Sequence, residues 1–294
     1  MSKLNGNRKV DKNEPIATPE MIREVREKFL EDYKANADLY ESVDIEKIKQ
    51  NDFYVRRYIN YLNQGPEKGL EQMKKAYRWR KEFNLNHFDQ LTVPKEMYQL
   101  GALFTYPPDK NGDLLLYVRG KMHRKIELVA DRIKHYFAYH VNKLDEKAGR
   151  EYGWSIIIDA TDTGYANADL NMLLFVFETL RTAFPNGIKY FIIYGLPWIL
   201  NAFATFVLQL LPSNALSKIR FFDKQQLFAF VDEANLPDFL GGTCKEVYRR
   251  VPKEAKDIYS LAEEEGLTRE ETDKLLKPSL KYIDNVNFVW VDHI

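Results

Sequence analysis

The sequence predicts an α/β fold that follows an all-helical N-terminal section. Up to about residue 90, apolar side chains recur at the spacing of amphipathic helices. From about Leu100 onward, short runs of β-branched and aromatic residues alternate with helical segments, which is typical of a mixed or parallel sheet covered by helices. With 294 residues, 45% of them hydrophobic, the chain has room for one large domain or two smaller ones.

The first section is predicted to be a helical extension over residues 19–90. Residues 1–18 are polar and lack the apolar core of a signal peptide, so we expect a disordered leader there. Thr18 is a plausible N-cap with Pro19 at the first helical position. Two further apolar-periodic stretches, 52–62 and 69–83, predict more helices before a linker that ends at Pro94.

The α/β part is predicted over residues 91–250. The apolar runs predict strands at 102–106, 114–118, 154–159, 188–194 and 218–222. The first two strands flank Asn111-Gly112, a strong hairpin signal. Helical patterns lie between and after the strands, at 126–147, 169–184, 198–211 and 225–231. Residues 251–294 are charged and helical in pattern and are expected to form a C-terminal appendage.

From Tyr190 to Ser217 the chain carries no charged side chain, although 29% of all residues are charged. Such a stretch must lie in a bilayer, in a core, or against an apolar ligand. Gly195-Leu196-Pro197 interrupts it, so a strand followed by a helix from Trp198 to Leu211 fits better than one long helix. A helix of about 14 residues reaches only about 21 Å, which is too short to span a bilayer.

The helix predicted over 198–211 is apolar in almost every direction, with only a thin row of polar residues. That row consists of Asn201, Thr205 and Gln209. A surface helix normally has one apolar stripe and one polar face. Two interpretations remain open: a fully buried core helix, or a lid over a hydrophobic cavity that also contacts lipid.

Composition excludes several functional classes. The 43 basic and 43 acidic residues give no net charge, so nucleic acid is not an expected partner. The single cysteine, Cys244, fits a reducing compartment. His135 and His140 are five residues apart, off the spacing for a shared metal, and we expect no metal or cofactor. Asp159 and Asp162 are candidates for an acid–base pair, with capping of a turn as the favoured alternative, so an enzyme is not expected.

Several separated segments resemble one known family. They are Ile157–Gly164, Phe184-Pro185, Leu196-Pro197, Ser217-Lys218-Ile219 and Leu236–Gly242, preceded by a helical leader that ends in Trp79-Arg80-Lys81-Glu82. Their order and spacing are similar to those of the CRAL-TRIO lipid-binding family over roughly residues 40–250. The resemblance implies a mixed five-stranded sheet with an apolar cavity on one face, closed by a mobile helix.

The resemblance also implies a function and a site. We expect a non-enzymatic protein of the cytoplasm, peripheral at membranes, that binds one phospholipid or other lipid and transfers or presents it during transient membrane contact. The expected lid and cavity residues are Ile157, Ile193, Trp198, Leu200, Phe203, Phe206, Val207, Leu210 and Leu211, with Lys218 at the headgroup. The alternative is an interaction module whose cavity is filled by its own side chains.

One position departs from the family pattern. Members that transfer phosphatidylinositol carry an acidic residue directly after a Tyr-Pro pair, together with the lysine that corresponds to Lys218. Here Asn186 stands at the acidic position. We therefore expect inositides to be poor ligands compared with other lipids, because buried hydroxyls of the inositol ring would lose hydrogen-bond partners.

Overall fold

The chain divides into two compact units in a computed structural model that describes residues 17–149, 153–284 and 286–294. The units are Met1–Glu82 and Phe83–Ile294, so the division falls ahead of the boundary predicted after residue 90. Most of the predicted leader, 1–18, lies outside the described residues. Thr18 does cap the first helix, since its side chain accepts a hydrogen bond from the amide of Met21.

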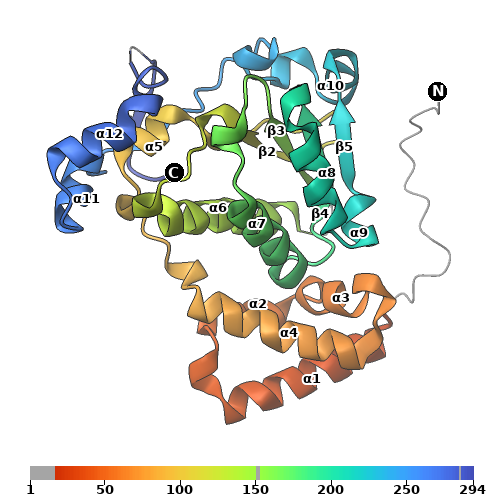
Figure 1. Cartoon of the computed structure of the whole chain (residues 1–294). Coiled ribbons are helices and arrows are strands. Elements are labelled where there is room, and N and C mark those ends of the chain that lie inside the picture. The colour runs from red at the N-terminus through yellow and green to blue at the C-terminus, as the bar shows by residue number, and fades with distance from the viewer. Residues whose placement is uncertain (1–16, 150–152, 285) are drawn as a thin grey trace. The chain divides into compact units, whose positions relative to one another are not determined.

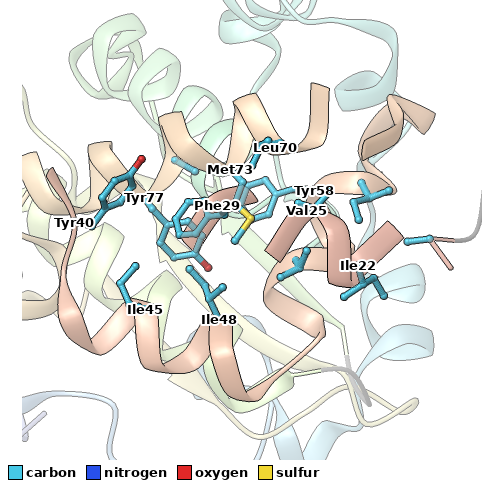
Figure 2. Packing of buried hydrophobic residues seen from close by; sticks show 14 residues of the cluster. Ile22, Val25, Phe29, Tyr40, Ile45, Ile48, Tyr58, Leu70, Met73 and Tyr77 are labelled. Carbon is cyan, nitrogen blue, oxygen red and sulfur yellow. The ribbon is translucent and has the colours of Figure 1, made fainter. Parts of the chain in front are cut away.

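The described part of the first unit is helical (Figure 1). Its helices are α1 (Pro19–Ala35), α2 (Ser42–Gln50), α3 (Phe53–Ile59) and α4 (Gly65–Glu82). Figure 2 shows the apolar side chains that these helices bury together. Phe29 of α1 is fully buried, and its ring lies edge-on to the rings of Tyr40 and Tyr77, with centroids 5.3 and 5.6 Å away. This aromatic cluster gives the unit a hydrophobic core of its own.

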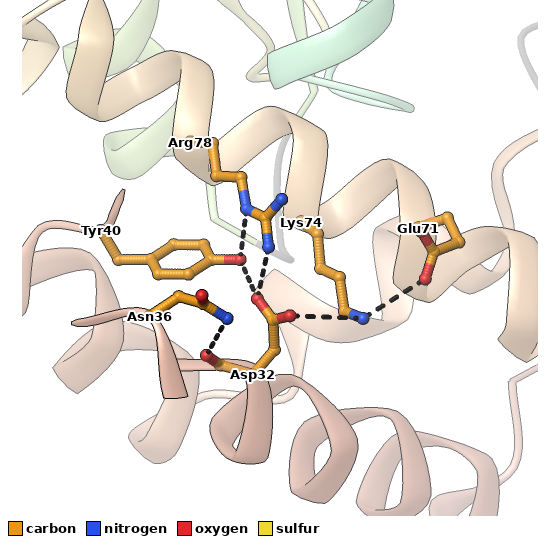
Figure 3. A network of polar contacts seen from close by, with 6 residues as sticks. All are labelled: Asp32, Asn36, Tyr40, Glu71, Lys74 and Arg78. Carbon is orange, nitrogen blue, oxygen red and sulfur yellow. Dashed lines mark hydrogen bonds and ion pairs between the residues drawn. The ribbon is translucent and has the colours of Figure 1, made fainter. Parts of the chain in front are cut away.

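Two of the polar interactions that join α4 to the earlier segments of this unit involve arginines of α4. In the first, Asp32 accepts a hydrogen bond from the Tyr40 hydroxyl and, at 2.8 Å, one from Arg78 (Figure 3). Burial, with the hydrogen bond to Asp32, raises the pKa of Tyr40 to about 12. In the second, Arg80 donates two hydrogen bonds of 2.9 Å to the carboxylate of Asp44, and both side chains are buried. The bidentate geometry fixes α4 relative to α2.

The second unit contains the sheet and the remaining helices. Its strands are β1 (Leu103–Tyr106), β2 (Leu114–Arg119), β3 (Trp154–Asp159), β4 (Ile188–Tyr194), β5 (Ile219–Phe222), β6 (Arg250–Pro252) and β7 (Val289–Val291). Its helices are α5 (Lys95–Leu100), α6 (Glu127–Ala148), α7 (Leu170–Ala183), α8 (Asn201–Gln209), α9 (Ser213–Leu216), α10 (Lys224–Phe230), α11 (Ile258–Glu264) and α12 (Arg269–Leu280).

The main sheet has the order β1-β2-β3-β4-β5 and is mixed, as predicted. β1 and β2 pair antiparallel, and β2, β3, β4 and β5 follow one another in parallel. The parallel strands are joined through α6, α7 and α8–α9. Because parallel crossovers are right-handed and each moves one strand further along the sheet, α6, α7 and α8 lie on the same face. The opposite face is covered by α10 and the segment after it.

Two sequence predictions about elements need correction. The helix expected over 198–211 is shorter: a 3₁₀ turn, Trp198–Leu200, leads into α8, which ends at Gln209 before Pro212 starts the turn into α9. The appendage expected over 251–294 also contains β6 and β7, which pair in parallel, besides its helices. Three-residue strands are too short to give a period-two signal. This segment packs back on the unit, since Val251 is buried with Tyr98 and Tyr136.

Replacing Asp44 with Ala should leave the Arg80 guanidinium buried without the carboxylate of Asp44. Removing one member of a buried ion pair typically destabilises by about 3–5 kcal/mol. We expect a loss of this size in the free energy of opening of the first unit, measured by hydrogen exchange of the amides of α1 and α4. Lys28→Ala is the control, because Lys28 and Glu24 form an exposed pair. Equal protection in the two variants would contradict the structural role of Asp44.

Candidate functional site

A cavity of about 300 Å³ lies between the sheet and the helices on one of its faces. The wall is made mainly of apolar side chains. It includes Val118, Ile156, Ile158, Phe191, Ile193, Ile219 and Phe221 from the sheet, Val129, Ile133 and Phe137 from α6, and Met172, Leu173, Val176 and Phe177 from α7. Small-molecule sites are usually apolar cavities of about 300–1,000 Å³. The cavity is therefore large enough for an apolar ligand or for one acyl chain.

The alternation along β3 decides which isoleucines face the cavity. Ile156 and Ile158 line it, whereas Ile157 is fully buried in the core on the opposite face, together with Tyr117 and Ile192. The cavity residues of β3 are therefore Ile156 and Ile158 rather than the predicted Ile157, because successive side chains of a strand point to opposite faces. Ile193, on β4, does line the cavity.

The turn and helix that were expected to form the lid divide their apolar side chains between two sides. Leu200, Phe203 and Val207 line the cavity. Trp198, Phe206 and Leu210 do not line it and are 81%, 48% and 47% exposed. Leu211 is buried outside the cavity wall. Thus α8 has the apolar surface on both sides that its composition suggested, and four of the predicted lid residues lie away from the cavity.

An open groove of about 800 Å³ lies beside the cavity, along α8 and the ends of β4 and β5. Asn201 and Thr205 line it, so two members of the polar row face this groove rather than the cavity. Ala204 and Leu208 belong to both walls, which makes α8 the partition between the two spaces. Gly195 starts the turn into this helix with φ +65°, and a Cβ there would lie 2.3 Å from Thr161.

Polar groups gather at one part of the cavity wall. His123 Nε2 lies 3.0 Å from Asp169 Oδ2, and Asn167 donates to the carbonyl of His123 at 2.9 Å. Partial burial opposes the charge of Asp169, but hydrogen bonds from the Met172 amide and from His123 lower its pKa. Sequence reasoning missed this cluster because residues 46 positions apart form it.

Lys218 lies away from the cavity and the groove. It precedes β5, and its Nζ donates a hydrogen bond of 2.8 Å to the carbonyl of Ile188, at the start of the neighbouring strand. It lines neither space. The groove instead borders Tyr194 and Phe222, the last residues of the same two strands. The predicted headgroup contact through Lys218 is therefore not supported by its position.

The residues considered for catalysis have structural roles here. Asp159 accepts hydrogen bonds from the amide and hydroxyl of Thr161, and Asp162 forms an ion pair of 3.1 Å with Lys121. In the described ranges, no group of His, Cys, Asp and Glu is arranged to hold a metal ion. No helix within the same ranges is long and apolar enough to cross a membrane.

The adjacent residues Ile157 and Ile158 provide a test of the cavity. Ile157→Ala should destabilise the protein by about 2–5 kcal/mol, because it opens a void in a packed core. Ile158→Ala should cost at least roughly 1 kcal/mol less, because its side chain already borders empty space. Urea unfolding of the ligand-free protein measures both. Equal losses would show that the two faces of β3 are equally well packed.

Comparison with known proteins agrees with this architecture. Residues 98–242 match the family model described as CRAL/TRIO domain. Protein real-time of Drosophila pseudoobscura pseudoobscura is 22% identical over 227 residues, which cover 70% of this chain and 34% of that protein. The phosphatidylinositol/phosphatidylcholine transfer protein SFH13 of Arabidopsis thaliana is 22% identical over 275 residues, which cover 82% of this chain and 42% of that protein.

The chain thus spans less than half the length of these two relatives. Among solved structures, the crystal structure of Sfh5 superposes with a TM-score of 0.54 and 12% sequence identity. The superposition covers 69% of this chain and 81% of that one, and at this identity it shows a shared fold. Residues 98–242 of the chain therefore form a CRAL-TRIO domain.

Proposed function

We propose that this protein binds a single lipid in the cavity and exchanges it at membrane surfaces. The observation that carries the proposal is an apolar cavity that α8, a helix with apolar side chains on both sides, separates from the open groove. A lipid leaves a bilayer only if its chains enter an equally apolar container, because each CH₂ exposed to water costs about 0.8 kcal/mol. The CRAL-TRIO domain over residues 98–242 and the name of the Arabidopsis relative support this function.

The proposed membrane contact is the apolar surface around α8. Trp198, Phe206, Leu210, Leu216 and Phe221 are all exposed. No charged residue interrupts the chain from Tyr190 to Ser217. Tryptophan is favoured at the membrane–water interface, and an apolar helix face can lie in that interface. In this proposal α8 is a mobile lid: it rests on the membrane with its outer side while the cavity fills behind it.

We propose further that the His123–Asp169 pair receives the polar end of the ligand, in place of Lys218. Both residues belong to the cavity wall, where an ionisable pair faces a largely apolar space. Phosphatidylinositol is not the ligand we favour, since Asn186 replaces the expected acid and Lys218 lies elsewhere. The proposed setting is the cytoplasm, with peripheral attachment to membranes.

Within the family, Leu196–Ala202 and Tyr77–Glu82 resemble the CRAL-TRIO domain of motile sperm domain-containing protein 2. We propose that domain as a near relative. In the same proposal, residues 91–250 form the lipid-binding domain, 19–90 the helical extension and 251–294 the appendage.

Filling the cavity should abolish lipid uptake. Ile158→Trp adds an indole to the wall, and we expect uptake of fluorescent phosphatidylcholine from vesicles to fall at least about tenfold, because the chain loses its apolar container. Val247→Trp is the matched control, since Val247 is exposed and borders neither space. Native mass spectrometry of the purified protein should show a bound lipid in wild type and in the control. A wild-type protein that stays empty and takes up nothing would favour the interaction module with a filled cavity.

A charge on either side of α8 should have different consequences. Phe206→Asp should weaken binding to vesicles about ten- to a hundredfold, since an aromatic side chain contributes about 1.5–3 kcal/mol when it leaves water. Its melting temperature should stay close to that of wild type, because the side chain is exposed. Phe203→Asp should keep vesicle binding and lose lipid uptake. Co-sedimentation and uptake assays separate the two effects, and a large drop in melting temperature for Phe206→Asp would mean that this helix is ordinary core.

A further inference from the structure

Two arginines lie over the ring of one tyrosine near the carboxyl end of β2. Arg119, the last residue of β2, is only 5% exposed. Its guanidinium carbon lies 4.1 Å from the ring centroid of Phe239 and 5.8 Å from that of Tyr248. The guanidinium carbon of Arg249 lies 4.8 Å from the same Tyr248 ring. Two positive charges therefore gather around one tyrosine.

Neither arginine has a full set of partners. In the part of the chain that the structure describes, Nε of Arg119 and Nε of Arg249 are buried and without a hydrogen-bond partner. Arg119 Nη1 reaches the carbonyl of Leu100 only at 3.5 Å, the outer limit of a hydrogen bond. Buried polar groups nearly always have partners, and an exception indicates a water or an ion that completes the site.

The surrounding charges compensate these cations only in part. Asp159 is the register partner of Arg119 on β3, but its Oδ1 accepts hydrogen bonds from Thr161. Asp238 accepts a long hydrogen bond, 3.4 Å, from the hydroxyl of Tyr248. Burial lowers the pKa of Arg119, and repulsion from Arg249 adds to it, while Tyr248, Asp159 and Asp238 offset this. No ion pair joins either arginine to a carboxylate of the described residues.

A buried cation without a counter-charge destabilises the folded protein. Replacing it with an apolar residue of similar volume is often neutral or stabilising. Arg119 is such a cation, and the partly buried Arg249 lies over the same Tyr248 ring, so a common counter-ion would compensate both charges. We propose that Arg119 and Arg249 form a binding site for an oxyanion, a phosphate or carboxylate group. The planar guanidinium fork matches the oxygens of these groups, and Phe239 and Tyr248 hold it by cation–π contact.

The position of the site allows two sources for the anion. Arg119 borders the cavity next to Leu100 and Gly120, but its guanidinium packs against Phe239 and Tyr248 of the opposite core, so a lipid in the cavity supplies the anion if its headgroup passes the carboxyl end of β2. This form of the inference rests on the proposed lipid-binding function. A free phosphate or phosphate ester can supply the same chemistry without any lipid.

Thermal unfolding with inorganic phosphate tests the site directly. We expect phosphate to raise the melting temperature of wild type at constant ionic strength, and Arg119→Met and Arg249→Gln to lower the apparent affinity at least about tenfold. Arg220→Gln is the matched control. Arg220 lies 5.0 Å from the Tyr190 ring, but its Nη1 donates to the carbonyls of Ser217 and Ile219 at 2.8 Å, so the phosphate effect should persist.

Stability without the anion gives a second readout. In phosphate-free buffer, Arg119→Met should melt at the wild-type temperature or higher, because it removes an uncompensated buried charge. A lower melting temperature together with an unchanged phosphate response would overturn the proposal and make Arg119 a packing residue. Arg249 is only partly buried, so Arg249→Gln remains informative even if the other variant does not fold.

Vesicles distinguish the two sources. Phosphatidylcholine vesicles that contain either phosphatidic acid or diacylglycerol offer the same acyl chains with and without the phosphomonoester. Selective uptake of phosphatidic acid that is lost in Arg119→Met supports the lipid-borne anion. A phosphate response without lipid uptake supports a free-anion site and contradicts the proposed function instead. Uptake of both lipids alike, with no effect of inorganic phosphate on melting, would contradict the oxyanion site and leave the proposed function intact.

Discussion

The parallel pairing of β2, β3, β4 and β5 is the constraint on which the site depends. Once the register is set, each strand sends alternate side chains to opposite faces. On β3 this separates Ile157, in a dense aromatic core, from Ile156 and Ile158, in the cavity wall. One face therefore supplies the stability of the unit, and the other can stay underpacked. A one-residue slip would exchange the two sets and destroy both.

The helix α8 depends on this division. It closes the underpacked face, so its inner residues have little to pack against, while its outer residues have no protein over them. A helix with few buried contacts lies at the low-stability end of a structure, where opening requires little free energy. The glycine turn at Gly195 and the proline at Pro212 bound the segment, so a movement of α8 does not have to disturb β4 or β5.

Much of this architecture could be predicted from the sequence, because strands and helices have strong local signals. The five strands of the main sheet, the Thr18 cap and the charge-free run were all evident. Features that depend on distant residues were not. The register of β3 in the sheet decides whether Ile157 or Ile158 faces the cavity. The run of consecutive isoleucines looks the same in the sequence in both cases. The His123–Asp169 pair, the Arg119–Arg249 cluster and the β6–β7 pairing join residues far apart in the chain.

Lys218 shows the limit of a sequence motif. A family motif identified the residue type correctly, but its position at the start of β5 directs it to the carbonyl of Ile188 rather than to the cavity. A motif thus fixes which residue is present, and the strand that carries it fixes what the residue can reach.

The most direct test of the central claim uses the isoleucine methyl groups of these strands. The δ-methyl resonances of Ile156, Ile158 and Ile193 should shift and show NOEs to acyl-chain protons when the labelled protein takes up a lipid, since these residues line the cavity. Those of Ile157 and Ile192 should not contact the lipid, because they lie in the core on the other face. Lipid NOEs to Ile157 and Ile192, or none to Ile156, Ile158 and Ile193, would contradict the account.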